Sequence, residues 1–158
     1  MLKAVEQKSI PAGGAAFAIV ASRYNARYVD AMVRAARAEL KRSGAAVRVV
    51  RVPGAYEIPV VAARLARATV PPPGGIICLG VILRGATTHA QHIGEAVSTA
   101  LVQIQIKYEV PVIHEVLLLE NETQARERCL DPKHNRGLEA AQTALEMARV
   151  MKTLVNPV

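Results

Sequence analysis

Residues 80–89 read Gly-Val-Ile-Leu-Arg-Gly-Ala-Thr-Thr-His, and the interpretation of the whole chain starts from this stretch. It overlaps the apolar run Ile76–Val81 and precedes a segment with helical periodicity, which predicts the junction between a buried parallel strand and a helix. Open α/β sheets bind ligands at such junctions. Gly85 lets the backbone turn, and the three amides that follow it would point outward from a helix N-terminus, where anions bind. Arg84 adds a charge, and His89 adds a group that titrates near neutral pH.

Strand and helix patterns alternate along the rest of the chain. We expect strands at Ala16–Ser22, Val47–Val52, Ile76–Val81 and Val112–Leu119. The second of these alternates Val with Arg, which indicates a strand near the sheet edge, whereas the third is apolar throughout and should be central. This alternation predicts four parallel strands joined by right-handed crossovers in a three-layer α/β/α sandwich.

The helical segments carry apolar residues at helical spacing. Asn25 is expected to cap the first helix, which should end at Gly44. The helix after residues 80–89 should be about 19 residues long, and a last helix should begin at Gly137. The expected buried stripe of the long helix is Ile93, Ala96, Val97, Ala100, Leu101 and Ile104.

Composition indicates one domain with a single core, because the chain has 158 residues and 51% of them are hydrophobic. We expect residues 1–15 to form an N-terminal arm, either a loose tail or an edge strand lent to a neighbouring subunit, and residues 16–158 to form the domain. Between its strands, the proline-rich segment Thr69–Gly75 should be a loop. Cys78 and Cys129 provide no disulfide framework and fit a reducing cytoplasm. We find no apolar run of membrane-spanning length and no stretch typical of a signal peptide.

The formal net charge of +7 favours acidic partners. The basic residues are dispersed along helical segments without interleaved aromatic residues, so we do not expect nucleic-acid binding. Four of them gather near one loop, which is more typical of a small phosphate site than of a groove for a polymer. These four are Arg126, Arg128, Lys133 and Arg136.

Three loops follow the first three expected strands, at residues 22–25, 54–57 and 84–89. Because parallel strands end at the same edge of a sheet, these loops should converge in space. They would bring Tyr24 and His89 to one pocket, together with a carboxylate and exposed backbone groups. This inventory suits a flat, polar heterocycle stacked on Tyr24, with His89 as the proton carrier.

Other kinds of site are less well supported. His89 and His92 stand three residues apart, a spacing that can hold zinc, but no third ligand of the right kind is near in the sequence. His92 is more typical of a structural residue. The loop after the first strand has neither a dinucleotide nor a P-loop fingerprint, nor the Ser/Thr-rich loop of a flavodoxin. A bound dinucleotide or FMN is therefore not predicted.

Seven stretches, in this order and at this spacing, resemble the signature motifs of the lumazine synthases of riboflavin biosynthesis, and the resemblance runs from about Phe17 to Met151. They are Ser22–Asn25, Pro53–Pro59, Gly80 with Arg84–His89, Val110–Ile113, Glu120-Asn121, Gln124-Ala125 and Asn135–Gly137.

The resemblance implies a flavodoxin-like domain that assembles into homopentamers, with each active site between neighbouring subunits. It implies a transferase that condenses 5-amino-6-(D-ribitylamino)uracil with 3,4-dihydroxy-2-butanone 4-phosphate, releasing phosphate and water. Neither a metal nor an organic cofactor is implied, and neither a membrane nor a nucleic acid is an expected partner.

The resemblance also implies roles for individual residues. Tyr24 would stack on the uracil, and His89 would transfer protons. Ala86 and Thr87 would bind the butanone phosphate through backbone amides, joined by Arg128 from the adjacent subunit. Further contacts to the pyrimidine and ribityl chain would come from Ala55, Tyr56, Glu57, Val81, Ile82, Leu83 and His114. Auxiliary residues would be Asn25, Thr88 and Arg136.

The chain departs from the family pattern at three places. His114 stands where the family usually has Phe; it could still stack on a pyrimidine, and it adds a titratable group. Arg136 replaces a common Lys and keeps the charge. The loop Leu130–His134 lacks the Gly- and Lys-containing sequence of many members that form 60-subunit shells, so the subunit count beyond a pentamer stays open. His114 also keeps open a catalytically weak paralogue that binds lumazine or flavin or serves as a scaffold.

Overall fold

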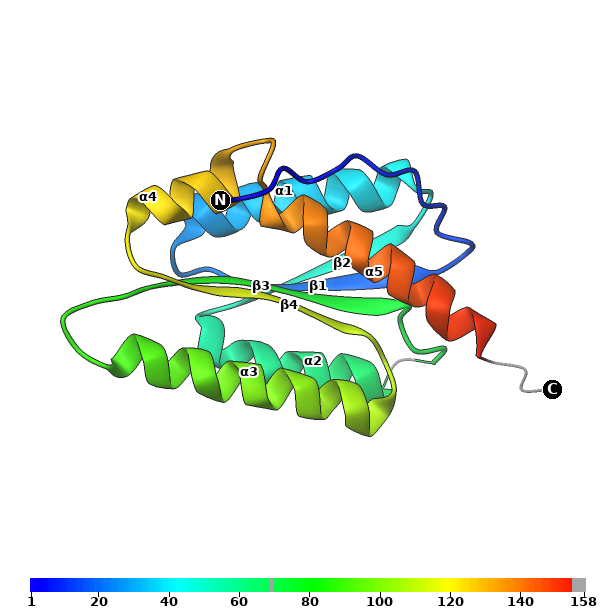
Figure 1. Ribbon diagram of the computed structural model, residues 1–158. Helices are drawn as coiled ribbons and strands as arrows, with labels where there is room; N and C mark the ends of the chain where they lie inside the picture. Colours follow the sequence, from blue (N-terminus) through cyan, green and yellow to red (C-terminus); the bar gives the residue numbers. More distant parts are fainter. Residues whose placement is uncertain (69, 155–158) are drawn as a thin grey trace.

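A computed structural model of the chain describes residues 1–68 and 70–154. Thr69, the first residue of the expected proline-rich loop, and residues 155–158 of the expected domain lie outside the described residues. Figure 1 shows three layers, with one β-sheet between two layers of helices. The predicted three-layer α/β/α sandwich is thereby confirmed.

The sheet has four parallel strands: β1 (Ala16–Ser22), β2 (Ala46–Val52), β3 (Gly75–Leu83) and β4 (Val112–Leu119). Their order is β2-β1-β3-β4, so β2 lies at an edge and β3 in the interior, as predicted. β3 extends two residues beyond the expected end at Val81, because its pairing with β4 continues as far as Leu83 opposite Leu119. All four strands therefore end at one edge of the sheet.

The helices cover both faces of the sheet. Helices α1, α4 and α5 lie on one face, and α2 and α3 lie on the other (Figure 1). A 3-10 turn precedes α2, and a π-helical turn follows α4. The bounds are α1 (Ala26–Arg42), the 3-10 turn (Ala55–Glu57), α2 (Ile58–Ala68), α3 (His89–Tyr108), α4 (Glu122–Ala125), the π turn (Arg126–Leu130) and α5 (Arg136–Thr153).

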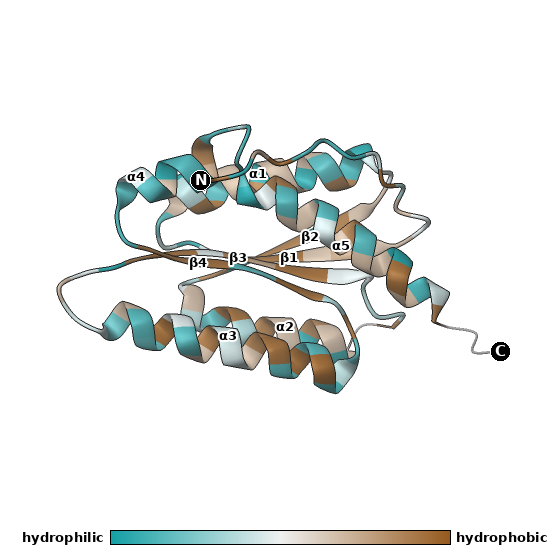
Figure 2. Ribbon diagram, viewed as in Figure 1, coloured by the Kyte–Doolittle hydropathy of each residue, from teal (hydrophilic) through white to brown (hydrophobic). Residues whose placement is uncertain are grey.

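Successive side chains of each strand point to opposite faces, so the sheet builds two hydrophobic cores instead of the single core that composition indicated. In β3, Ile77 and Leu79 pack on the side of α1 and α5, whereas Ile76 and Cys78 pack on the side of α2 and α3. Figure 2 shows the apolar sheet between the two helix layers, with hydrophilic residues concentrated on the outer side of α1 and α4. An apolar central sheet covered on both faces is what the unbroken apolar run in β3 predicts.

The N-terminal arm packs on its own protomer. Ile10 and Ala12 are buried in the core on the side of α1 and α5. The backbone N–H of Val5 donates to the carbonyl of Lys133 at 2.7 Å, and Lys8 pairs with Glu146 of α5 at 3.0 Å. Residues 1–15 form no strand here, and the strand lent to a neighbour remains a prediction.

Helix α3 buries a narrower stripe than expected. Val97, Leu101 and Ile104 are buried as predicted, but Ala96 is exposed, and Ile93 and Ala100 are only half-buried. The prediction of a six-residue stripe was wrong because Ile93 and Ala96 border a cavity at the carboxyl ends of the strands instead of packing in the core. Within the described residues, no helix is both long enough and apolar enough to cross a membrane.

Candidate active site

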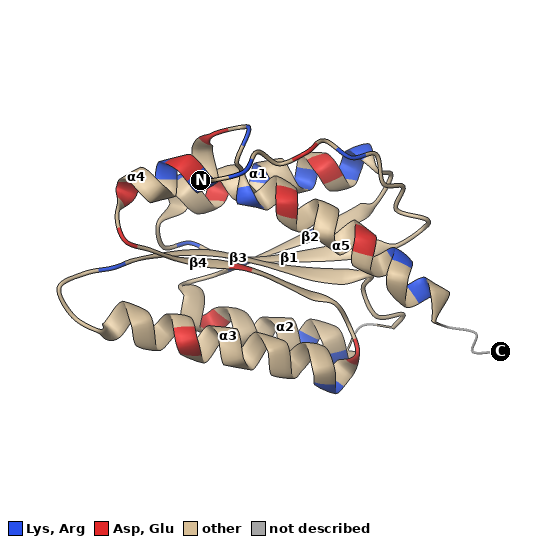
Figure 3. Cartoon of the chain, viewed as in Figure 1, with Lys and Arg blue, Asp and Glu red and all other residues tan. Residues whose placement is uncertain are grey.

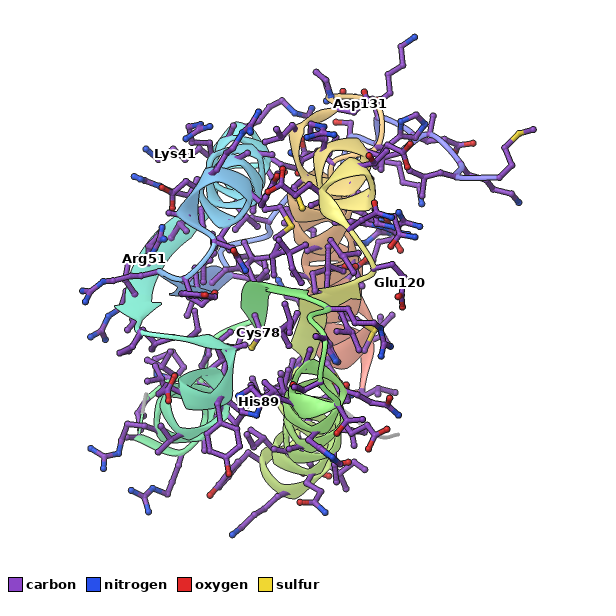
Figure 4. All side chains as sticks on the ribbon, turned by 90° about the vertical axis from the view of Figure 1, so that its left-hand side faces the viewer. Lys41, Arg51, Cys78, His89, Glu120 and Asp131 are labelled. Carbon is purple, nitrogen blue, oxygen red and sulfur yellow. The ribbon has the colours of Figure 1, made fainter. Side chains whose placement is uncertain are left out.

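A cavity of about 930 Å³ opens at the carboxyl ends of β1, β2 and β3. All three predicted loops contribute to its wall, so the expected convergence is present. Figure 4 looks onto this edge of the sheet and places His89 between α2 and α3. The lining residues are Tyr24, Asn25, Gly54, Ala55, Tyr56, Glu57, Val81, Ile82, Leu83, Gly85, Thr87, His89, Ala90, His92, Ile93 and Ala96.

Two tyrosines stand at the pocket with their side chains largely in solvent. Tyr24 is 74% exposed and Tyr56 is 65% exposed. The backbone of the first loop is held to the neighbouring strand end, since the N–H groups of Arg23 and Tyr24 donate to the carbonyls of Val52 and Pro53 at 2.7 and 3.1 Å. An exposed aromatic ring on an anchored backbone can stack on a planar ligand at little cost in backbone order.

Asn25 occupies the cap position of α1, but its side chain does not cap the helix. Its backbone adopts the left-handed conformation, with φ 58°, and its side-chain Nδ2 donates instead to the carbonyl of Val81 at 2.7 Å. The expectation of a side-chain cap was wrong because the turned backbone aims the amide across to β3. Asn25 therefore joins the first loop of the site to the end of the third strand.

The second loop is closed by its own carboxylate. The Oε2 atom of Glu57 accepts from the backbone N–H of Gly54 at 2.9 Å. A Cβ atom at residue 54 would lie 3.0 Å from that oxygen, so glycine leaves room for the contact. This hydrogen bond holds the 3-10 turn that carries Ala55 and Tyr56 along the pocket wall.

The loop between β3 and α3 is exposed from Arg84 to His89. Thr87 Oγ1 accepts from the N–H of His89 at 3.4 Å, which marks the first turn of α3. Among the described residues, no acceptor lies in hydrogen-bonding position for the amides of residues 86–88. These amides at the positive end of a long helix can therefore receive an anion.

Arg84 does not add its charge to this pocket, contrary to expectation. Its Nε lies 2.9 Å from Oε2 of Glu120, beyond the end of β4. The backbone N–H of Arg84 also donates to the carbonyl of Leu119 at 2.8 Å. The parallel register of β3 and β4 places the two charged residues side by side, so the guanidinium is directed away from the pocket and faces Glu120.

A family model described as 6,7-dimethyl-8-ribityllumazine synthase matches residues 14–152. The chain belongs to the lumazine synthase family. It is 41% identical over 143 residues to the 6,7-dimethyl-8-ribityllumazine synthase of Stenotrophomonas maltophilia strain R551-3, covering 89% of this chain and 91% of that relative. The 6,7-dimethyl-8-ribityllumazine synthase of Xanthomonas oryzae pv. oryzae is also 41% identical over 143 residues, covering 89% of this chain and 92% of that relative.

A solved de novo designed Rossmann fold protein superposes on this chain with a TM-score of 0.38 at 15% identity, covering 70% of this chain and 90% of the design. The fold of this lumazine synthase family member is established here by its own strand order and layers.

Three residues assigned by resemblance to lumazine synthases lie outside the pocket of their own chain. Arg128 is on the π turn, 3.9 Å from Glu127, and Arg136 opens α5 and pairs with Glu139. His114 is exposed on β4, the edge strand furthest from β2. Ala86 and Thr88 belong to the pocket loop but do not line the cavity.

The predicted cluster of basic residues is largely neutralised in this member of the lumazine synthase family. Arg126 pairs with Glu122 at 3.5 Å, and Arg128 and Arg136 have the glutamate partners given above. Near them on β4, burial raises the pKa of the Glu115 carboxyl to about 7, opposed by the charge of Arg136. Three of the four basic residues of this cluster therefore have a carboxylate partner within their own chain.

The sequence interpretation missed His92 as a pocket residue. His92 and His89 both line the cavity, because residues three apart share one face of a helix. This spacing can also hold a metal ion. Within residues 1–68 and 70–154, no group of three or more His, Cys, Asp or Glu side chains is arranged to hold a metal ion.

Proposed function

We propose that the protein condenses 5-amino-6-(D-ribitylamino)uracil with 3,4-dihydroxy-2-butanone 4-phosphate to give 6,7-dimethyl-8-ribityllumazine, phosphate and water. The observation that carries this proposal is the single pocket in which Tyr24, the Glu57 turn and His89 meet, in a chain of the lumazine synthase family. Mixing the purified protein with both substrates and following lumazine absorbance tests it. A catalytically weak paralogue that binds lumazine or flavin would give little or no turnover in this assay.

The chemistry requires positioning and proton transfer rather than a covalent intermediate. The amine of the uracil attacks the ketone of the butanone phosphate, and water leaves as the imine forms. Phosphate is then eliminated, and ring closure onto the remaining carbonyl releases a second water; both steps require protons to move at neighbouring atoms. Holding both substrates in register supplies much of the rate enhancement of such a reaction. His89 lines the pocket and is the group that we assign to proton transfer.

The uracil and the phosphate would occupy different parts of the cavity. The ring of Tyr24 would stack on the pyrimidine, with Tyr56 and the end of β3 along the ribityl chain. The phosphate would bind at the free amides of residues 86–88, where the α3 dipole stabilises the charge that develops as phosphate leaves.

We propose that a second protomer completes each pocket, because among the described residues no Lys or Arg lines the cavity. Helix α3 has an outer surface that suits an interface. Val102 is 48% exposed and Ile106 is 70% exposed. Figure 3 shows many charged residues on the α1, α4 and α5 layer and few on α3. An uncharged helix face with exposed aliphatic side chains favours contact with another copy.

Replacing both Val102 and Ile106 with Glu should yield protomers that no longer assemble. Burying a charge in an apolar interface costs far more free energy than leaving it at a free surface. We expect native mass measurement to show a smaller particle than the wild type, with lumazine formation reduced at least about tenfold. Arg37→Glu on the exposed face of α1 is the control and should leave particle mass unchanged. An active particle of wild-type mass for the double variant would refute this interface.

Arg128 is proposed to bind the phosphate of the butanone substrate in the neighbouring pocket. Arg128→Ala should raise KM for the butanone phosphate about tenfold or more, since a charge-assisted hydrogen bond contributes about 1.5–3 kcal/mol. KM for the uracil should change little. Steady-state kinetics with each substrate varied in turn measures the two KM values separately. Arg126→Ala, two residues earlier, is the matched control, and equal loss toward both substrates would contradict the assignment.

The two cysteines, Cys78 and Cys129, are free and buried, and burial raises the pKa of each thiol to about 12. Neither is a nucleophile at neutral pH. This use of cysteine fits the cytoplasm as the compartment in which we propose that the enzyme works.

A further inference from the structure

His114 replaces the usual aromatic residue of the family, and its ring is held at both nitrogens. Nδ1 accepts from the backbone N–H of Val116 at 3.1 Å. Nε2 lies 2.7 Å from Oγ of Ser98, which projects from α3. The imidazole thus bridges the edge strand and the helix that begins at His89.

These partners decide which ring nitrogen carries the proton. The N–H of Val116 can only donate, so Nδ1 must present its lone pair. The Ser98 hydroxyl donates its own hydrogen to the carbonyl of Gly94 at 2.8 Å, so its oxygen accepts from Nε2–H. Only the neutral imidazole protonated at Nε2 satisfies all three hydrogen bonds.

The Glu95 carboxylate would favour a charge on the ring, but partial burial of the ring outweighs it. Cys78 of β3 is in register with His114, and its thiol stays neutral because burial raises its pKa to about 12. On α3, Glu95 lines the same groove as Ser98 and accepts a hydrogen bond from Gln91 at 2.9 Å. One edge of the His114 ring is exposed, but its packing removes enough water to lower the pKa of the imidazole.

We propose that His114 is a positioning residue of the condensation: a neutral ring, locked by Val116 and Ser98, that β4 presents to the pocket of a neighbouring protomer. Protonation would place an N–H on Nδ1 against the N–H of Val116, and the ring would have to turn out of this position. Because both ring nitrogens of His114 are held in hydrogen bonds, proton transfer is left to His89. This inference rests on the proposed function for its catalytic part, but not for the state of the ring.

The ring state is measured without any substrate. Nitrogen-15 NMR of the full chain labelled at histidine, between pH 5 and pH 8, should show one histidine held as the Nε2–H tautomer and titrating below the ordinary value of about 6.5. His114→Phe identifies this signal by its loss. If that variant does not fold, Ser98→Ala identifies it, because among the four histidines only His114 contacts Ser98 in the described structure. An Nδ1–H tautomer, or a ring charged at pH 7, would overturn the proposal.

The catalytic part is tested by the pH dependence of kcat/KM. His114→Phe keeps an aromatic face but cannot be protonated, and any effect of His89 is common to both proteins. The kcat/KM of the wild type divided by that of His114→Phe should therefore fall about two- to tenfold between pH 7.5 and pH 5. The ratio of wild type to His134→Gln, a histidine paired with Asp131 at 2.8 Å, should stay constant. A constant ratio for His114→Phe would refute the positioning role. If the wild type forms no lumazine, the proposed function is refuted. The NMR result would then still show whether the His114 ring is held in the neutral Nε2–H form.

Discussion

His89→Ala is expected to lower kcat for lumazine formation about 100-fold while changing KM for either substrate only a few-fold. General acid–base catalysis by one positioned group typically contributes a factor of about 10² to 10⁴. His89 stands at the first residue of α3, beside the free amides proposed to hold the phosphate. Removing its imidazole leaves these amides and the stacking surface in place, so ground-state binding should persist. Steady-state and single-turnover kinetics measure the two effects separately.

His92→Ala is the matched control for this experiment. His92 lies one turn later on the same face of the same helix and lines the same cavity. If proximity to the pocket alone mattered, the two alanine variants would lose similar activity. We expect His92→Ala to retain kcat within about threefold of the wild type, since it lies one helical turn further from the phosphate amides than His89. A comparable loss in both variants, or a loss in His89→Ala confined to KM, would contradict the assigned role.

Gly137→Ala is expected to destabilise the fold by about 3 kcal/mol. A Cβ atom at this position would lie 2.1 Å from the carbonyl oxygen of Met32 and 2.6 Å from its carbonyl carbon. These are backbone atoms of α1, so no rotamer change can relieve the overlap. Helices α1 and α5 would have to separate, and the core that they share would open. The gain in helix propensity from glycine to alanine, about 1 kcal/mol, does not offset this cost.

Denaturant unfolding followed by circular dichroism measures the effect as a lower midpoint at similar cooperativity. Gly94→Ala is the control, because it is the same substitution within a helix where the new Cβ would meet only Leu118 side-chain atoms at 3.6 and 3.7 Å. That variant should match or slightly exceed the wild-type stability. A Gly137→Ala protein as stable as Gly94→Ala would show that the two helices do not cross as closely as described.

Much of the architecture could be predicted because it depends on local pattern. The bounds of β1 and β4 agree with the apolar runs at Ala16–Ser22 and Val112–Leu119. The alternation of Val with Arg in β2 correctly indicated an edge strand, since polar side chains avoid a face that is covered. The convergence of three loops followed from parallel strand direction alone.

Side-chain partners could not be predicted in the same way. Asn25 has the residue type of a helix cap, yet its amide contacts Val81, 56 residues away. Arg84 looked like part of an anion site, yet it pairs with Glu120. In each case the residue type allows several partners, and the register of neighbouring strands decides which one lies within reach.

The sequence by itself determined the class of fold, the order of its elements and the family, because apolar periodicity and motif spacing are properties of the chain alone. Only the tertiary structure decided the hydrogen-bonded state of His114, the direction of Arg84 and the close approach at Gly137. Each of these depends on distances of a few ångströms between segments remote in sequence. Such distances are set by how the helices and strands pack, and no local pattern encodes them.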